Sequence, residues 1–272
     1  MTTASHARPQ RDIHRVTGPR VLRSEWSKFW DLRSTWITLG IAMVLLIGFG
    51  LLSAARYDPT SDHTGRLGGS VTDAVAAAMG GQQFAQLAIG VLGVLVMAGE
   101  YSTGMIRSTL TAVPKRLPVL LAKTTMFFGV VTVASFAAVL VSFLAGHSAL
   151  ADTDIAAGLT DDRILRGLTG AALYFGLVGV IGIGLGGLLR SVAGGIASVV
   201  VLLMLLPVLT DLLPSDMSDS ISKYLPSNAG ASIYALTHDS STLSPEAGLL
   251  VFAAWAAAAV GAAGYRLMRT DA

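Results

Sequence analysis

Cysteine is absent from the 272-residue chain. This absence excludes disulfide bonds, thiolate zinc sites and cysteine nucleophiles, and it leaves the redox compartment undetermined. The chain also lacks the G-x-x-x-x-G-K-[ST] sequence of a phosphate-binding loop and the H-E-x-x-H sequence of a zinc site. Its five histidines are scattered, and none has metal-ligand spacing with another. The sequence therefore predicts no nucleotide-hydrolysing site, no cofactor and no metal bound by this chain.

Charged residues are also scarce, at 13% of the chain, whereas a soluble domain has about 25%. Hydrophobic residues make up 53%, and the mean hydropathy is +0.64. Glycine is frequent, with 30 residues, which suits close packing of helices in lipid. The net charge of +2 is small, so the basic pI does not indicate a nucleic-acid partner. This composition predicts an integral membrane protein.

A helix needs about 20 apolar residues to cross the ~30 Å hydrocarbon core of a bilayer. Six stretches of the chain meet this requirement, and each predicts a transmembrane helix. They cover residues 36–55, 81–99, 118–145, 168–189, 192–213 and 247–267. We therefore expect an all-α, polytopic membrane protein with one transmembrane domain, 19–272, behind a polar, disordered tail, 1–18.

The distribution of basic residues predicts the orientation. Fourteen of the 19 Lys and Arg residues flank the spans on the side that holds both termini. The other five are Arg56, Arg66, Arg163, Arg166 and Lys223. Because cytoplasmic loops carry an excess of Lys and Arg, we expect both termini in the cytoplasm and the protein in the plasma (inner) membrane.

A predicted amphipathic helix, 19–34, precedes the first span. Leu22, Trp26, Phe29 and Trp30 fall at helical spacing on one face, and basic residues including Lys28 lie largely on the other. Trp and basic residues in this arrangement are typical of a helix lying in the membrane interface. Two interpretations remain: an anchor that sets the height of the first span, or a docking element.

The stretch between the second and third predicted spans, 99–116, is the most informative in the chain. Glu100 lies at the mouth of a span, where a carboxylate is costly unless it is paired or hydrated. Arg107 follows two helical turns later. Met105, Ile106, Leu110 and Val113 could form one apolar face of a short helix, capped by Ser102 or Thr103. The alternative is a solvated loop.

Three further patterns bear on packing and transport. The spans lack ionisable residues near their midpoints, so we expect no ion-coupling site. The run Gly182-Ile183-Gly184-Leu185-Gly186 allows another backbone to approach closely, either within the chain or in a dimer. The long loop 214–244 predicts short helices, since structureless loops of that length are uncommon.

These motifs resemble the permease subunits of type-2 ATP-binding-cassette (ABC) exporters, actinobacterial members most of all. The resemblance is strongest at Gly99-Glu100-Tyr101-Ser102-Thr103-Gly104-Met105-Ile106-Arg107. It also includes Leu22-Arg23-Ser24-Glu25-Trp26-Ser27-Lys28, Pro114-Lys115-Arg116 and Tyr224-Leu225-Pro226-Ser227-Asn228-Ala229-Gly230.

The resemblance implies a transmembrane permease that is not itself an enzyme. Two copies of a separate ABC ATPase would bind ATP and Mg²⁺, and a second permease copy would complete a homodimer. A cytoplasmic coupling helix between spans two and three would contact the ATPase. Its implied contact residues are Glu100, Tyr101, Gly104, Met105, Ile106, Arg107, Pro114 and Arg116. The residues that the resemblance assigns to the interface helix are Trp26, Lys28, Phe29 and Trp30. The family's substrates are too diverse to predict one here.

Other functions remain as alternatives. One is an autonomous secondary transporter or channel; the lack of midplane charges counts against ion coupling but not against a passive pore. Another is a non-transporting membrane scaffold or assembly subunit, and the last is a membrane enzyme.

Overall fold

A computed structural model describes residues 18–57, 71–106 and 116–269, apart from short gaps at 152, 154, 160, 211 and 238–241. Within these ranges, every regular element is a helix. Six helical segments are long and apolar enough to cross a membrane. The structure thus confirms the expected all-α, polytopic membrane fold. Apart from Gly18, the predicted tail lies outside the described residues.

Twelve elements follow one another along the described chain. The first six are α1 (Gly18–Asp31), α2 (Arg33–Ala55), α3 (Ala74–Ala78), α4 (Gln82–Ser102), α6 (Arg116–Leu150) and α7 (Asp162–Leu189). The second six are α8 (Val192–Val200), a π-helix (Val201–Leu205), α9 (Leu206–Thr210), α10 (Ser215–Ser222), α11 (Pro226–Tyr234) and α12 (Pro245–Arg269).

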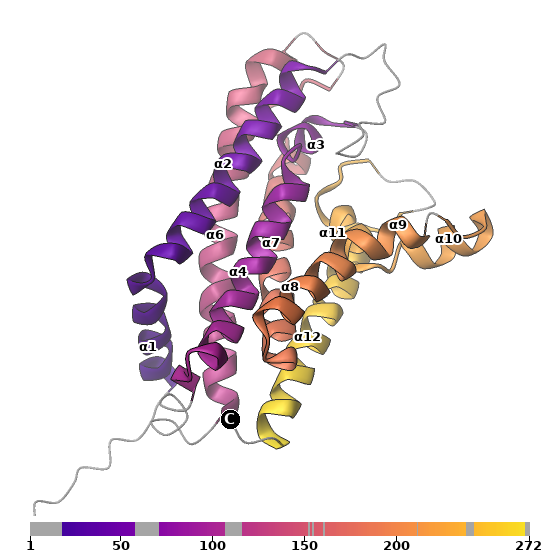
Figure 1. The fold of residues 1–272 in the computed structure, drawn as a ribbon. Helices are drawn as coiled ribbons and strands as arrows, with labels where there is room; N and C mark the ends of the chain where they lie inside the picture. The colour runs from indigo at the N-terminus through magenta and orange to yellow at the C-terminus, as the bar shows by residue number, and fades with distance from the viewer. Residues whose placement is uncertain are drawn as a thin grey trace, which may run out of the picture.

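The long helices run side by side as a bundle with α7 at its centre (Figure 1). α7 packs most extensively against α4, α12 and α6, whereas α2 packs on the outside against α6 and α4. α1 and α3 lie at opposite ends of the bundle (Figure 1). We call these ends the α1 end and the α3 end. The C-terminal part of α12 lies at the α1 end.

Glycines allow α7 to approach its neighbours closely on two sides. A Cβ atom on Gly182 would lie 2.3 Å from the carbonyl oxygen of Gly90 in α4, and one on Gly184 would lie 2.6 Å from Ala259 in α12. Carbon atoms do not approach that closely, so only glycine fits at these positions. The glycine run therefore makes contacts inside the chain, which decides between the two expectations for it.

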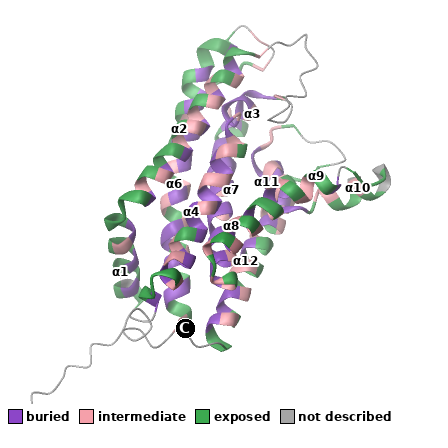
Figure 2. Cartoon of the chain, viewed as in Figure 1, coloured by how far each residue is buried: buried purple, intermediate pink, exposed green. Residues whose placement is uncertain are grey.

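The fifth span differs from the others because it is broken and leaves the bundle. The π-helix widens the turn just before Pro207, which has no N–H to donate and whose ring crowds the preceding turn. We call the segment Val192–Ser222 the arm. Only 17% of its apolar window, Val192–Thr210, is buried, against 72% for α7. Figure 2 shows mostly exposed and intermediate residues along the arm.

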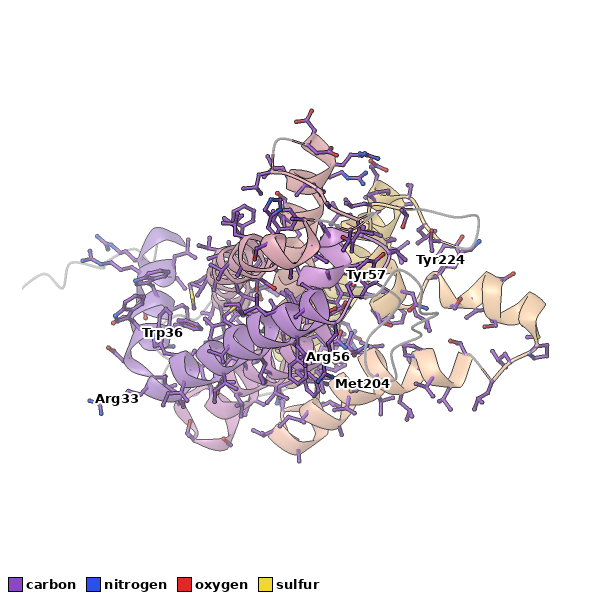
Figure 3. All side chains as sticks on the ribbon, turned by 90° about the horizontal axis from the view of Figure 1, so that it is seen from above. Arg33, Trp36, Arg56, Tyr57, Met204 and Tyr224 are labelled. Carbon is purple, nitrogen blue, oxygen red and sulfur yellow. The ribbon has the colours of Figure 1, made fainter. Side chains whose placement is uncertain are left out.

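The arm begins against the bundle and then diverges from it. Near its start, Gly195 lies against Val94 of α4. Seen from above, the arm runs toward the right, and Tyr224 just after it lies on the opposite side of the molecule from Trp36 (Figure 3). The chain then returns through α11, which packs against α12 and α7. Helices α10 and α11 are the short helices expected within 214–244.

Helix ends differ from the sequence-based boundaries in two informative places. The first helix ends at Asp31 instead of reaching 34, because Leu32 is extended (φ −85°, ψ 100°) and α2 starts at Arg33. The bend is packed by Trp36, whose ring lies 4.6 Å from that of Trp30. Helix α7 begins at Asp162, earlier than 168, because the Asp161 carboxylate accepts a hydrogen bond from the Arg163 N–H and caps it.

Candidate functional site

Helix α1 has one face buried in the bundle and another at the surface. Val21, Glu25 and Phe29 are 5%, 2% and 4% exposed, whereas Trp26 and Trp30 are 48% and 56% exposed. The aromatic residues expected on one apolar face therefore have different surroundings: Phe29 packs inward on Phe127, and the two Trp rings stack on each other at the surface. Exposed Trp rings are stable at a membrane interface, so the bundle need not cover them.

The buried face of α1 carries a charged side chain into the bundle. Glu25 meets Lys123, near the start of α6, with 2.5 Å between the carboxylate oxygen and Nζ. Lys123 also contacts Glu100, near the end of α4, at 2.8 Å. Lys28 closes the group from α1, at 2.8 Å from Glu25 and 3.4 Å from Glu100. We call these four residues the ion cluster.

The ion cluster is electrically balanced and nearly dry. It contains two carboxylates and two ammonium groups, and only Lys28 has substantial exposure, with 26% of its side chain accessible. Buried ion pairs offset their desolvation only when each charge has well-placed partners, and removing one partner costs about 3–5 kcal/mol. The cluster therefore makes the relative positions of α1, α4 and α6 strongly dependent on one another.

The pKa values of the two α1 residues follow from this balance. Burial by itself would raise the pKa of Glu25, but the charges and hydrogen bonds of Lys123 and Lys28 outweigh it and hold the pKa below 4.5. Burial would lower the pKa of Lys28, and the carboxylates of Glu25 and Glu100 instead raise it above 10.5. Both residues therefore stay charged at neutral pH.

One atom of the cluster is incompletely satisfied. Glu100 Oε2 is buried and has no hydrogen-bond partner among the described residues. A buried polar atom in this condition costs about 1–3 kcal/mol. Glu100 is therefore the member of the cluster that gains most from an additional donor.

The cluster lies close to the end of α4. The Ser102 and Thr103 hydroxyls both donate to the Gly99 carbonyl at 2.9 Å, so they finish α4. Gly104 follows with a φ of +74°, a left-handed conformation that favours glycine and stops the helix. Helix α6 begins at Arg116. Segment 103–115 is thus attached at both ends beside the ion cluster.

Arginines at the same end of the bundle bind the carbonyl groups that terminate α12. Arg116 donates to the Leu267 oxygen at 2.8 Å, and Arg190 donates to the Arg266 oxygen at 3.4 Å. Arg190 also lies over the Tyr101 ring, 5.1 Å from its centroid. Cations at helix C-termini are favourable because the last carbonyls are unpaired and carry partial negative charge. These contacts join α4, α6, α7 and α12 at the α1 end.

A second polar cluster, without formal charge at its centre, lies toward the α3 end. The Tyr174 hydroxyl donates to Gln86, and the Tyr234 hydroxyl donates to Gln82. The Tyr174 ring stacks on Phe252 with 5.3 Å between centroids. Burial raises the pKa of Tyr234 well above its ordinary value, since a phenolate there would be unsolvated. We call these two Tyr–Gln pairs the tyrosine cluster; they join α4 to α7 and α11.

Asp73 stands beside the tyrosine cluster. This buried residue caps α3 by accepting from the Ala76 N–H at 2.8 Å, and it also accepts from the Leu236 N–H at 3.3 Å. It therefore links α3 to the chain that follows α11, and its charge is held by backbone donors.

The predicted site residues fall into three groups. The structure brings Glu100 and Lys28 together in the ion cluster, and it places Tyr101 and Arg116 in the arginine contacts. Gly104 and Met105 are exposed and Ile106 is buried, just after the end of α4. Arg107 and Pro114 lie outside the described residues, as does most of the expected coupling helix.

Sequence reasoning missed two members of the ion cluster as site residues, Glu25 and Lys123. A signal for Glu25 existed, because it falls between Val21 and Phe29 at intervals of four residues, on one helical face. Lys123 could have been considered as a partner for Glu100, because the two residues lie near the connected ends of the second and third predicted spans. The tyrosine cluster gave no comparable signal, since its residues are far apart in the sequence.

No protein-family model matches this sequence, and no curated protein matches it. The function proposed below therefore depends on the geometry of the described residues and on the sequence resemblance.

Proposed function

We propose that this chain is the permease subunit of an ATP-driven exporter of the type-2 ABC class, working with separate ATPase subunits in the plasma membrane. The observation that carries the proposal is the ion cluster, which ties α1 and α6 to the end of α4 beside segment 103–115. An ATPase docked on that segment would act on three helices at once. In this proposal the α1 end is cytoplasmic.

The geometry supports transmission of force by a simple route. Lys123 contacts a carboxylate on α1 and another on α4, so a displacement of segment 103–115 moves the ends of α4 and α6 and draws α1 with them. The Glu100 Oε2 atom, which has no hydrogen-bond partner among the described residues, gives the cluster a site at which to accept another donor. Exchange of partners there would allow two discrete arrangements, as a switch between inward- and outward-facing states requires.

The energy source would be a partner, because the sequence lacks a phosphate-binding loop. ATP and Mg²⁺ would bind the two ATPase subunits, and this chain would form the substrate pathway with a second copy of itself. The arm supports such pairing, since it presents a line of exposed apolar residues beside the bundle. Among them are Val201, Leu205, Val208, Leu209 and Leu212.

The decisive experiment is purification of the tagged protein from its native membrane in mild detergent after crosslinking, followed by mass spectrometry. We expect a P-loop ATPase in stoichiometric amount with the wild type. Arg107→Glu, in the proposed coupling segment, should reduce the recovered ATPase while membrane insertion stays normal. The matched control is Arg269→Glu, which reverses an exposed charge at the end of α12.

Recovery of the permease without any ATPase, even after crosslinking, would contradict the proposal and favour the channel or scaffold alternatives. Equal recovery of ATPase with Arg107→Glu and Arg269→Glu would remove the coupling role from segment 103–115.

Pairing of the arm can be tested separately because the chain has no cysteine of its own. Val208 in the arm and Val133 in α6 are both exposed valines, at 58% and 71%. We expect Val208→Cys to crosslink between copies in the membrane and Val133→Cys to remain monomeric. Equal crosslinking of the two variants would mean random collision and would count against an arm-mediated homodimer.

A further inference from the structure

A groove runs along the surface between α1 and α6, and none of the four residues of the ion cluster lines it. Its volume is about 390 Å³, toward the lower end of the ~300–1,000 Å³ typical of ligand sites. Leu22, Arg23 and Trp26 line it from α1, and Thr125, Met126, Gly129 and Val130 line it from α6. Arg23 and Thr125 are the polar residues of an otherwise apolar lining, and Arg23 is the charged one.

The floor of the groove is open because residue 129 has no side chain. A Cβ atom on Gly129 would meet no heavy atom within 4 Å. This glycine differs from Gly182 in α7, whose missing Cβ makes room for the backbone of α4. Close helix packing therefore does not account for Gly129, and the space above it is available to a ligand.

Charge is distributed so that one end of the groove attracts anions. Of the charged side chains near the groove, Glu25 and Lys28 turn inward to the ion cluster, whereas Arg20 and Arg23 are exposed. Arg23 therefore gives the mouth of the groove a positive charge. Trp26, stacked on Trp30 with 5.6 Å between centroids, lies beside it. Exposed Trp next to Arg is typical of the headgroup level of a bilayer.

Exposed apolar residues around the groove indicate that it opens to the hydrocarbon of the membrane. Leu121 and Val133, on the same helix as the α6 lining, are 56% and 71% exposed. In a membrane protein, such residues face acyl chains and not water. A ligand in the groove would thus have its apolar part in the hydrocarbon and its polar part at Arg23.

We infer that the groove between α1 and α6 binds an anionic phospholipid, with one acyl chain over Gly129 and the headgroup phosphate on Arg23. The lipid would come from the leaflet on the α1 side. It would fill the space between α1 and α6 and add to the contacts that hold α1 on the bundle. This binding does not depend on the chain being a permease.

The test is native mass spectrometry of the full-length protein, released from vesicles of equimolar phosphatidylglycerol and phosphatidylcholine. The two lipids have the same acyl chains and differ in the charge of the headgroup. The total amount of lipid retained therefore reports binding of the acyl chain in the groove, and the ratio of the two lipids reports the preference for a negative headgroup. We expect the wild type to retain one lipid, with a preference of about fivefold for phosphatidylglycerol, the effect of one basic residue on an anionic lipid. Arg23→Gln should reduce the ratio to about one.

Gly129→Leu should abolish retention of both lipids, since the new side chain would fill the groove. A Cβ at this position meets no other heavy atom within 4 Å, so the leucine fits without displacing its neighbours. The matched control is Gly48→Leu on the outer side of α2, where a Cβ also meets nothing within 4 Å. Arg33→Gln, an exposed arginine outside the groove lining, controls for charge. Both controls should bind lipid as the wild type does.

An unchanged lipid ratio in Arg23→Gln would overturn the headgroup assignment. If Gly129→Leu retained as much lipid as the wild type, the placement of the acyl chain over Gly129 would be wrong. If Gly48→Leu lost as much lipid as Gly129→Leu, the retained lipid would be annular lipid and not lipid bound in the groove. If Gly129→Leu does not fold, Arg23→Gln still tests lipid binding in the groove, because the Arg23 side chain is exposed and is not part of the packed core.

Discussion

The two polar clusters lie toward opposite ends of the bundle. Both join helices through buried polar side chains, but with different chemistry. Toward the α3 end, Tyr174 and Tyr234 each donate a hydrogen bond to a glutamine of α4. At the α1 end, two lysines and two glutamates share ion pairs. Both clusters join three elements and both are largely buried.

The difference concerns how each cluster responds when it is disturbed. A neutral hydrogen bond between helices in a membrane contributes about 0.6–2 kcal/mol, so its loss is local. A buried charge that loses its partner is far more costly, and the remaining charges must rearrange. The tyrosine cluster is suited to holding α4, α7 and α11 together. The ion cluster is suited to making the positions of α1, α4 and α6 interdependent.

The largest effect is expected from Lys123→Met. This substitution keeps the length of the side chain but leaves Glu25 and Glu100 facing each other with Lys28 as their one remaining counter-ion among the described residues. We expect destabilisation of about 3 kcal/mol, measured as a lower thermal unfolding midpoint in detergent. Lys223→Met is the control, because Lys223 lies beside the Tyr224 ring and outside both clusters. Equal midpoints for the two variants would show that the ion cluster does not fix the helices.

A smaller effect is expected from Tyr174→Phe. The ring and its stacking on Phe252 remain, but Gln86 loses the hydroxyl that donates to its carbonyl oxygen. We expect a loss of about 1 kcal/mol in the same unfolding assay. Tyr265→Phe is the control, since that side chain is 54% exposed. A loss as large as that of Lys123→Met would remove the contrast between the clusters.

The smallest effect is a pH dependence confined to the ion cluster. A carboxyl whose pKa is lower in the folded protein stabilises the fold above its ordinary pKa, and that contribution disappears as the pH falls through the folded value. The stability difference between wild type and Glu25→Gln should therefore be constant near neutral pH and shrink below about pH 4.5.

Lys28 should act in the opposite sense at high pH. Its raised pKa stabilises the fold below the ordinary value of 10.5, and the contribution disappears as the pH rises through the folded value. Tyr174→Phe should keep the acid profile of the wild type. A constant difference between wild type and Glu25→Gln down to pH 3 would contradict the assigned pairing of Glu25.

The sequence predicted the spans well because each is a long apolar run bounded by charges, and that pattern depends only on local composition. It also indicated that Glu100 needed a partner. It did not identify the partner as Lys123, or place Glu25 on the buried face of α1, since both depend on how helices far apart in the chain pack together. The Tyr174–Gln86 pair was missed for the same reason: it joins residues 88 positions apart.

The break in the fifth span was predicted in part. Pro207 indicated a bend, which follows from the missing N–H. The π-helix before it and the departure of the arm from the bundle were not predicted. Both depend on how little of the bundle is left for this span to pack against once α4, α6 and α12 surround α7.

The turn between α7 and α8 has a consequence for how the protein is made. Only Arg190 and Ser191 separate the two helices, and Arg190 adopts a left-handed conformation with φ of 54°. Two spans joined so tightly cannot enter the bilayer at widely separate times, because the two connecting residues are too few to let the first span insert while the second is still outside the membrane. They would leave the insertion machinery as one hairpin. The glycine-rich α7 would thus enter the lipid together with α8, the start of the arm, and pack against α4 and α12 afterwards.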